Sequence, residues 1–287
     1  MGQLGASNFN FNFNFGQAAG PTATAAGVRG NTLDFSKMVK PDQDALVPAK
    51  YASMRFPLNW DPELRASVYV NEFVRVYPEW ETHLQKPSII GVCPKDMSEP
   101  ELRQQLLQML NKAVERERRF FEIIQQHDAA GAIDYWHGML MLTPGRQPAT
   151  TLLIRVARRV GELVVMCLKD QYRCPRPSQL CPALIPMIDP PLTPSFPAGH
   201  ALQSWLITNC LNAAWPNRAD PRFLSELASR VAENREIAGL HFQRDNDAGK
   251  SVADELFTML NDEAKCPKFA RLMQEASKEF TGPDESA

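Results

Sequence analysis

The sequence predicts an all-α protein, and three observations lead to this fold class. Apolar residues recur at helical spacing over most segments after residue 100, so each of these segments has one apolar face. Proline and glycine separate the segments, as they commonly separate helices. The alternation of apolar and polar residues that marks a half-buried strand is confined to residues 8–15.

We expect the helices in the following order. The first half of the chain contains helices over residues 61–76 and 80–86, a long helical pattern over 101–124 and a helix over 130–142. The second half contains helices over residues 150–169, 201–214, 221–238, 252–262 and 268–280. In the long pattern, Arg116, Arg118 and Arg119 are expected to form the solvated side, because the apolar residues lie on the other face.

Helix breakers account for the ends of several of these helices. Pro144-Gly145 follows the helix over 130–142, and Pro175 and Pro177 prevent the next helix from continuing. Gly239 breaks the chain after the helix that precedes it. The breaks at Pro175 and Gly239 let the side chains on either side of them approach one point from different directions.

Length and composition fit one moderately large domain preceded by a tail. The 287 residues are enough to bury a substantial core, and a helical domain of this size need not divide. Residues 1–30 are low in complexity, and we assign residues 31–287 to a single helical domain. The 31 basic and 33 acidic residues give a net charge of −2, which shows no basic surplus for a nucleic-acid partner.

We expect the protein to be cytoplasmic, because the sequence shows neither a membrane span nor a signal peptide. Charged residues interrupt the apolar stretch over 151–168, which therefore falls short of the ~20 apolar residues of a span. No Lys or Arg precedes Arg29, and no continuous apolar segment follows Met1. In that compartment the six cysteines are expected to be reduced, and their spacing fits no zinc site, so we expect no metal.

The N-terminal tail contains an alternating segment, in which asparagine and phenylalanine follow one another over residues 8–15. In a strand, all the phenylalanines would lie on one face, and such a segment is prone to β-association. Two interpretations stay open. The segment is either an arm through which chains form a homo-oligomer or a flexible tail without a partner.

Three clusters of charged residues and histidines lie in the second half of the chain. In order they are Lys169-x6-Arg176-Pro177, Pro197-Ala198-Gly199-His200 and Arg235-x5-His241-x3-Asp245. Their three cations can neutralise the oxygens of a phosphate-like group, while one histidine attacks and the other protonates a leaving group. Asp245 lies four residues after His241, so on a helical turn its carboxylate reaches the ring and fixes the tautomer.

These clusters resemble the motifs of the superfamily that joins type 2 phosphatidic acid phosphatases, class A acid phosphatases and vanadium-dependent haloperoxidases. The pattern of that superfamily is K-x6-R-P, then P-S-G-H, then S-R-x5-H-x3-D. The first cluster matches in full, the second reads P-A-G-H and the third reads N-R-x5-H-x3-D. The resemblance is most specific over residues 169–249 and extends weakly to about residue 280. It implies a helical bundle of the acid phosphatase/vanadium haloperoxidase type, with the site at its centre.

The resemblance also implies a role for each motif residue. His241 is similar to the nucleophile of the phosphatases and to the vanadate ligand of the peroxidases. His200 is similar to the general acid, and Asp245 to the residue that orients the nucleophile. The implied oxyanion binders are Lys169, Arg176, Arg235 and the backbone N–H of Gly199.

Two positions depart from the superfamily pattern. Ala198 stands in place of a serine whose hydroxyl binds the anion, and Asn234 in place of the serine before the arginine. Losing one donor from an oxyanion site typically costs ~10²–10³ in rate, so we expect reduced activity. Ser195 is close in sequence, but nothing in the sequence shows that it substitutes.

We therefore predict a metal-independent phosphomonoester hydrolase that acts through a phosphohistidine. Its partner is a small phosphoester or an inorganic oxyanion, and no cofactor is expected. One alternative is a vanadium-dependent haloperoxidase, in which His241 holds vanadate as the cofactor in the same pocket. Another, from a different class, is a catalytically weakened anion-binding or assembly protein, which the alanine at position 198 favours.

Overall fold

The computed structural model describes residues 60–127, 135–216, 220 and 222–280, and over these ranges the protein is helical with no β-strand. From Pro62 on, the described residues belong to one compact unit. The tail that the sequence predicts over residues 1–30, with its alternating segment, lies outside the described residues. Among the described helices, none is long and apolar enough to cross a membrane.

The helices follow the predicted order closely. Before residue 126 they are α1 (Pro62–Val76), α2 (Trp80–Leu84), α3 (Pro87–Ile90), α4 (Glu99–Lys112) and α5 (Arg116–Gln125). After residue 147 they are α7 (Pro148–Tyr172), α8 (Pro177–Leu180), α9 (Gly199–Ala214), α10 (Phe223–Ile237), α11 (Gln243–Leu260) and α12 (Pro267–Lys278). Short 3₁₀ turns lie at Pro94–Asp96, Ala113–Glu115 and Pro182–Leu184. Of the helix expected over 130–142, residues 135–139 are helical, and its first part is not described.

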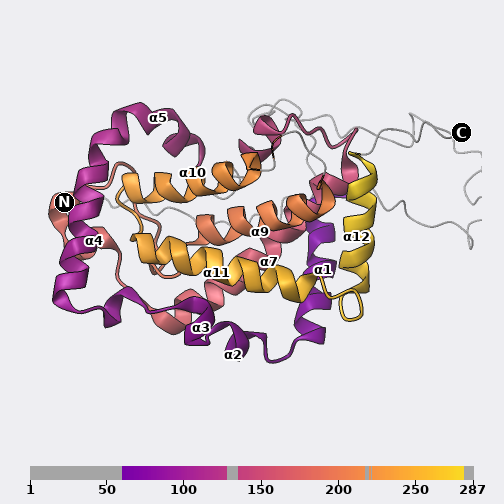
Figure 1. Cartoon of the computed structure of the whole chain (residues 1–287), viewed down its shortest axis with the longest axis horizontal. Coiled ribbons are helices and arrows are strands. Elements are labelled where there is room, and N and C mark those ends of the chain that lie inside the picture. The colour runs from indigo at the N-terminus through magenta and orange to yellow at the C-terminus, as the bar shows by residue number, and fades with distance from the viewer. Residues whose placement is uncertain (1–59, 128–134, 217–219, 221, 281–287) are drawn as a thin grey trace, which may run out of the picture. The chain divides into compact units, whose positions relative to one another are not determined.

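Helix α9 is the central element of the bundle. It packs against α7, α10, α11 and α12, and α1 covers the other side of α7 (Figure 1). Most of its residues are buried on all sides, including Leu202, Leu206 and Leu211, as expected for a helix enclosed by others. Because α9 is enclosed, its first turn is surrounded by the ends of neighbouring helices. The motif residues lie on or next to those helix ends, at the end of α7, the end of α10 and the start of α11.

A glycine allows α11 to cross the first turn of α9 closely. A Cβ atom added at Gly249 would lie 2.7 Å from the carbonyl oxygen of Ala198 and 3.0 Å from the backbone nitrogen of Leu202. Both neighbours are backbone atoms, so they cannot move aside as a side chain does. The N–H of Ala198 also donates to the carbonyl of Asp245 over 2.9 Å. The second and third motifs are therefore joined through the backbone.

Two predictions about the helices need correction. The long helical pattern is divided by a 3₁₀ turn at Ala113–Glu115, and its arginines are not all solvated. Arg116 donates to the carbonyls of Leu184, Ile185 and Ile237, because this side of α5 faces the end of α10 and the loop beyond α8. The helix expected over residues 252–262 is α11, which begins earlier, at Gln243. Asp245 therefore lies in the first turn of α11.

The expectation of six reduced cysteines is also wrong. Cys93 and Cys174 form a disulfide across 81 residues of sequence, which joins the turn after α3 to the segment after α7. Cys174 lies within the first motif, so the disulfide ties that motif to the turn after α3. The spacing of the cysteines does not reveal such a pair, because only the fold brings the two residues together. The free cysteines are Cys167, Cys181, Cys210 and Cys266.

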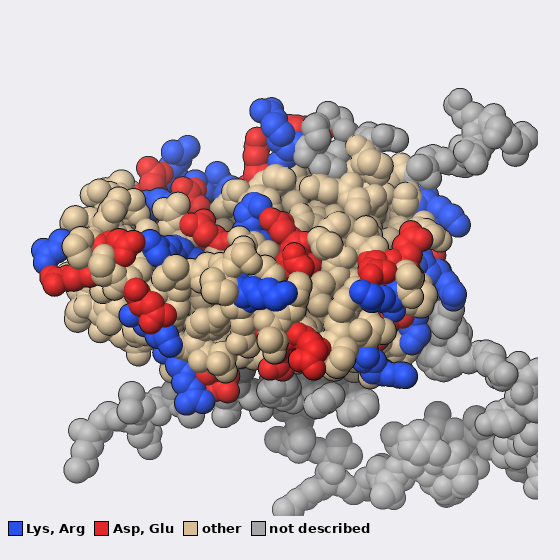
Figure 2. All heavy atoms as spheres, turned by 60° about the horizontal axis from the view of Figure 1, so that its bottom comes forward, with Lys and Arg blue, Asp and Glu red and all other residues tan. Residues whose placement is uncertain are grey.

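Basic and acidic side chains are mixed on the surface. On the face shown in Figure 2, lysines and arginines alternate with aspartates and glutamates, and no broad area carries one sign. This matches the net charge of −2. The buried cations of the motifs therefore differ from the rest of the molecule in being concentrated at one place.

Candidate active site

The structure brings the motif residues together at the first turn of α9. Lys169 comes from the last turn of α7, Arg176 from the segment before α8, and Arg235 from the last turn of α10. His241 lies in the short link between α10 and α11, and Asp245 in the first turn of α11. Each of these side chains is at most 4% exposed, although all are polar and most are charged. Polar residues are seldom buried this deeply without a function or a partner.

Gly239 positions His241 next to the cations. It has a φ of +83°, a conformation that glycine adopts readily, and it ends α10 so that the chain turns before α11. Without the turn, residues 235 and 241 would face different sides of one helix, since six residues do not complete a whole number of turns. Both residues therefore reach the same buried region.

The imidazole of His241 contacts Asp245 through Nδ1. The distance from Nδ1 to Asp245 Oδ2 is 3.2 Å, and the same oxygen accepts the backbone N–H of Phe242 over 3.0 Å. The Ser195 hydroxyl also donates to Oδ2, and it lies 3.3 Å from His241 Nδ1. Ser195 therefore supports the histidine–aspartate pair from the Nδ1 side.

Arg176 determines which nitrogen of His241 carries the proton. Its Nη1 lies 3.2 Å from His241 Nε2, and a guanidinium nitrogen can only donate. Nε2 must then be the acceptor, and Nδ1 carries the hydrogen that faces Asp245. The N–H groups of Arg176 also donate to the Leu240 carbonyl and the Thr193 hydroxyl, and to the carbonyls of Pro191, Thr193 and Pro194. These last three lie in the proline-rich segment, residues 182–197. Arg176 thus joins that segment to the ring of His241.

Lys169 holds the same proline-rich segment from the other side. Its ammonium group donates to the carbonyls of Pro194 and Ser195, the second over 2.8 Å. These carbonyls directly precede the second motif, which begins at Pro197. Lys169 and Arg176 therefore fix the path of the chain into α9 and lie beside the histidine–aspartate pair.

Arg235 and His200 meet at the backbone of Gln126. Arg235 Nη1 lies 3.3 Å from the Gln126 carbonyl oxygen, and His200 Nε2 lies 2.8 Å from the same atom. Arg235 is 1% exposed, yet its Nε and Nη2 atoms have no hydrogen-bond partner. Buried donors on a cation without acceptors are unfavourable, so this part of the site can accept further oxygens.

The electrostatic environment keeps His241 neutral. Burial lowers the pKa of His241 well below 6.5, and the charges of Arg176 and Lys169 lower it further. Burial and then the charge of Arg176 lower the pKa of Lys169 to about 7, and burial raises the pKa of Asp245 to about 6. Burial lowers the pKa of Arg235 to about 9, so its guanidinium remains charged at neutral pH. The site near pH 6.5 is a neutral imidazole among cations.

The alanine of the second motif has apolar surroundings. Ala198 is fully buried and packs with Ala201, Ala232 and Trp205. Ser195 does not stand in for the missing serine, because its hydroxyl is bonded on the Asp245 side of His241. Gly199 is the first residue of α9, where a helix leaves backbone N–H groups without internal acceptors and carries a partial positive charge. Its N–H remains the donor of this motif.

Asn234 has a structural role that the sequence did not show. Its side chain donates to Gln126 Oε1 over 3.0 Å and accepts from Arg119 Nη1 over 3.1 Å. The residue before Arg235 therefore holds the end of α5 against α10. Ser195 and Gln126 were likewise missed, since neither belongs to a motif and their roles depend on contacts 46 and 109 residues away in sequence.

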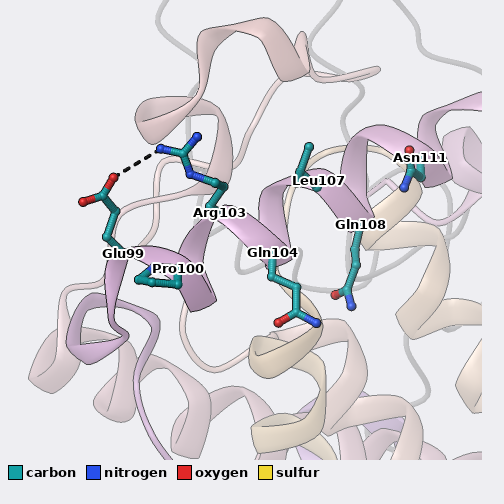
Figure 3. A pocket seen from close by; sticks show the side chains of 7 residues that line it. All are labelled: Glu99, Pro100, Arg103, Gln104, Leu107, Gln108 and Asn111. Carbon is teal, nitrogen blue, oxygen red and sulfur yellow. Dashed lines mark hydrogen bonds and ion pairs between the residues drawn. The ribbon is translucent and has the colours of Figure 1, made fainter.

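One groove on the surface borders this site through Arg176. It has a volume of about 690 Å³, and prolines and Leu192 of the proline-rich segment also line it. Another hollow, of about 550 Å³, runs along one face of α4 and contains no motif residue (Figure 3). Among the described residues, no group of three or more His, Cys, Asp or Glu side chains is placed to hold a metal ion.

Compared with known proteins, the chain matches no family model, and no curated protein matches it. The class that the observations define is therefore an all-α protein with a buried cluster of cations around a histidine–aspartate pair.

Proposed function

We propose that the protein is a phosphomonoester hydrolase that forms a phosphohistidine at His241. The observation that carries the proposal is the hydrogen-bonding of the His241 ring. Its Nδ1 faces Asp245 and its Nε2 faces Arg176, so the lone pair for attack is on Nε2, among cations. A neutral, oriented imidazole beside positive charge is what in-line attack on a phosphoryl group requires.

The reaction has two steps. In the first, His241 Nε2 forms a bond to phosphorus, the bond from phosphorus to the leaving oxygen breaks, and His200 gives its proton to that oxygen. In the second, His200 takes a proton from water, the water oxygen bonds to phosphorus and the phosphorus–nitrogen bond breaks. Lys169, Arg176 and Arg235 supply positive charge to the phosphoryl oxygens. The Arg176 N–H that now donates to Nε2 would pass to one of these oxygens.

The test is the release of phosphate from an aryl phosphate by the metal-stripped full chain, with and without orthovanadate. We expect turnover that orthovanadate inhibits and that His241→Ala abolishes. His83→Ala is the matched control, because His83 is a half-buried histidine that pairs with Glu255 on another part of the bundle. That variant is expected to keep full activity.

Other outcomes would replace the proposal. If the protein releases no phosphate but oxidises bromide with peroxide when loaded with vanadate, it is a haloperoxidase. If it binds orthovanadate and does neither, it is an anion-binding protein, and Ala198 is the first position to restore to serine.

A further inference from the structure

The end of α5 lies against His200 and Arg235. In the proposed reaction, His200 donates the proton and Arg235 neutralises charge on the phosphoryl group. The carbonyl oxygen of Gln126 lies 2.8 Å from His200 Nε2 and 3.3 Å from Arg235 Nη1. A carbonyl only accepts hydrogen bonds, so the proton of His200 Nε2 points at Gln126. An oxygen of a phosphoester held between His200 and Arg235 would need this same position.

We propose that α5 is a lid, and that the Gln126 carbonyl occupies the place of a substrate oxygen until the end of α5 moves away. The roles of His200 and Arg235 in this inference rest on the proposed function. The contacts that α5 makes with its neighbours are independent of the proposed function.

Arg235 favours exchange of the carbonyl for an anion. The Gln126 carbonyl satisfies one of its nitrogens, while Nε and Nη2 have no partner. A tetrahedral oxyanion brings several acceptors and a negative charge, and both are worth more to a buried guanidinium than one neutral carbonyl. Binding of the anion can therefore offset the loss of the contacts of Gln126.

Polar contacts hold α5 against α10. Glu122 pairs with Arg230, whose Nε donates over 2.6 Å, and Arg119 pairs with Glu233 over 3.0 Å. We call these two ion pairs the α5 latch. At the other end of the helix, Arg116 makes three hydrogen bonds of 2.8–2.9 Å to backbone carbonyls and anchors it. The arrangement allows the Gln126 end to swing while the Arg116 end stays in place.

Little apolar burial opposes that motion. Of the large apolar residues of α5, Ile123 is fully buried, but Phe121 is 81% exposed, Phe120 46% and Ile124 45%. A surface helix normally turns its apolar face to the core, and α5 turns its polar face there instead. Elements held by few buried apolar contacts open at low free-energy cost.

The experiment compares orthovanadate binding by the full chain with that of Arg230→Gln, which breaks one ion pair of the latch. If the lid is mostly closed, the apparent Kd scales inversely with the open fraction, so losing a half-exposed ion pair should tighten binding about two- to fivefold. Backbone amides of residues 120–126 should exchange hydrogen faster when orthovanadate is bound. The matched control is Arg103→Gln, which breaks the exposed pair with Glu99 on α4 and should bind as the wild type does.

The outcomes separate the lid from the proposed function. Tighter binding by Arg230→Gln together with faster exchange in α5 supports the lid. Orthovanadate binding that is equal in all three proteins, with no change of exchange in α5, overturns the lid and leaves the phosphatase proposal intact. If neither the wild type nor Arg230→Gln binds orthovanadate, the oxyanion site is wrong and the lid is wrong with it.

Discussion

The Ser195 hydroxyl donates to the same oxygen of Asp245 that faces Nδ1 of His241. This shared oxygen makes Ser195 a positioning residue of the proposed nucleophile. All three side chains are buried, so a lost hydrogen bond cannot be replaced by bulk water.

Replacing Ser195 tests this relationship. In Ser195→Ala, Asp245 loses a donor that lowers its pKa, so its pKa should rise and His241 should be less well oriented. We expect kcat to fall roughly ten- to a hundredfold with little change in KM, as for a hydrogen bond to a charged group. Ser195→Thr keeps the hydroxyl and should restore most of the activity. Equal loss in both variants would mean that Ser195 matters for packing alone.

The pH profile should be a narrow bell. Below about 6, Asp245 becomes protonated and no longer accepts the Nδ1 hydrogen of His241, so activity falls as pH falls. Above about 7, Lys169 loses its proton and its charge, so activity falls as pH rises. His241 stays neutral over this range because its pKa is well below 6.5. Measuring kcat from pH 4 to pH 9 checks both limbs, and in Ser195→Ala the acid limb should move to higher pH. A flat profile would show that neither group is required.

Gly249→Ala should destabilise the protein and impair the site. Its Cβ would lie 2.7 Å from the Ala198 carbonyl, so α9 and α11 must separate, at a cost of about 1–3 kcal/mol in the free energy of unfolding. Gly161→Ala is the matched control. There the nearest atom, at 2.9 Å, belongs to the end of the Leu202 side chain, which can move. Urea unfolding of both variants checks the difference, and equal midpoints would contradict the close approach of the backbones.

The disulfide should contribute to stability. Cys93→Ser opens a link between residues 81 apart, and the chain-entropy estimate for such a loop is about 4 kcal/mol. The melting temperature of this variant should fall, and dithiothreitol should lower that of the wild type but not of Cys93→Ser. Cys167→Ser is the control, because Cys167 is a partly buried free thiol.

The sequence predicted much of the bundle and the members of the motif cluster, for identifiable reasons. Helix order follows from apolar spacing and from breakers such as Pro175 and Gly239, which act locally. The predicted start of a helix is less accurate where a specific contact determines it. Helix α11 begins at Gln243, earlier than predicted, because the Asp245 carboxylate accepts the Phe242 N–H there. The apolar pattern predicts that Arg116 faces solvent, and it does not reveal the three carbonyl partners, because they lie 68 or more residues away in sequence.

The motif residues meet as their order suggested, but the groups that surround them were not predictable. Nothing in the pattern indicates that the Gln126 carbonyl would lie between His200 and Arg235. Nor does the alanine at position 198 reveal that it packs among other small residues. These contacts depend on how α5 and α10 are placed in space, which apolar periodicity does not specify.

Trapping the covalent intermediate tests the proposed hydrolase most directly. The full chain is mixed with a stoichiometric aryl phosphate, stopped with alkali within one turnover, digested and analysed by mass spectrometry. We expect a phosphoryl group on His241 that is stable in alkali, lost in acid and absent from His241→Ala. Turnover without a phosphorylated His241, or a phosphoryl group on another residue, would contradict it.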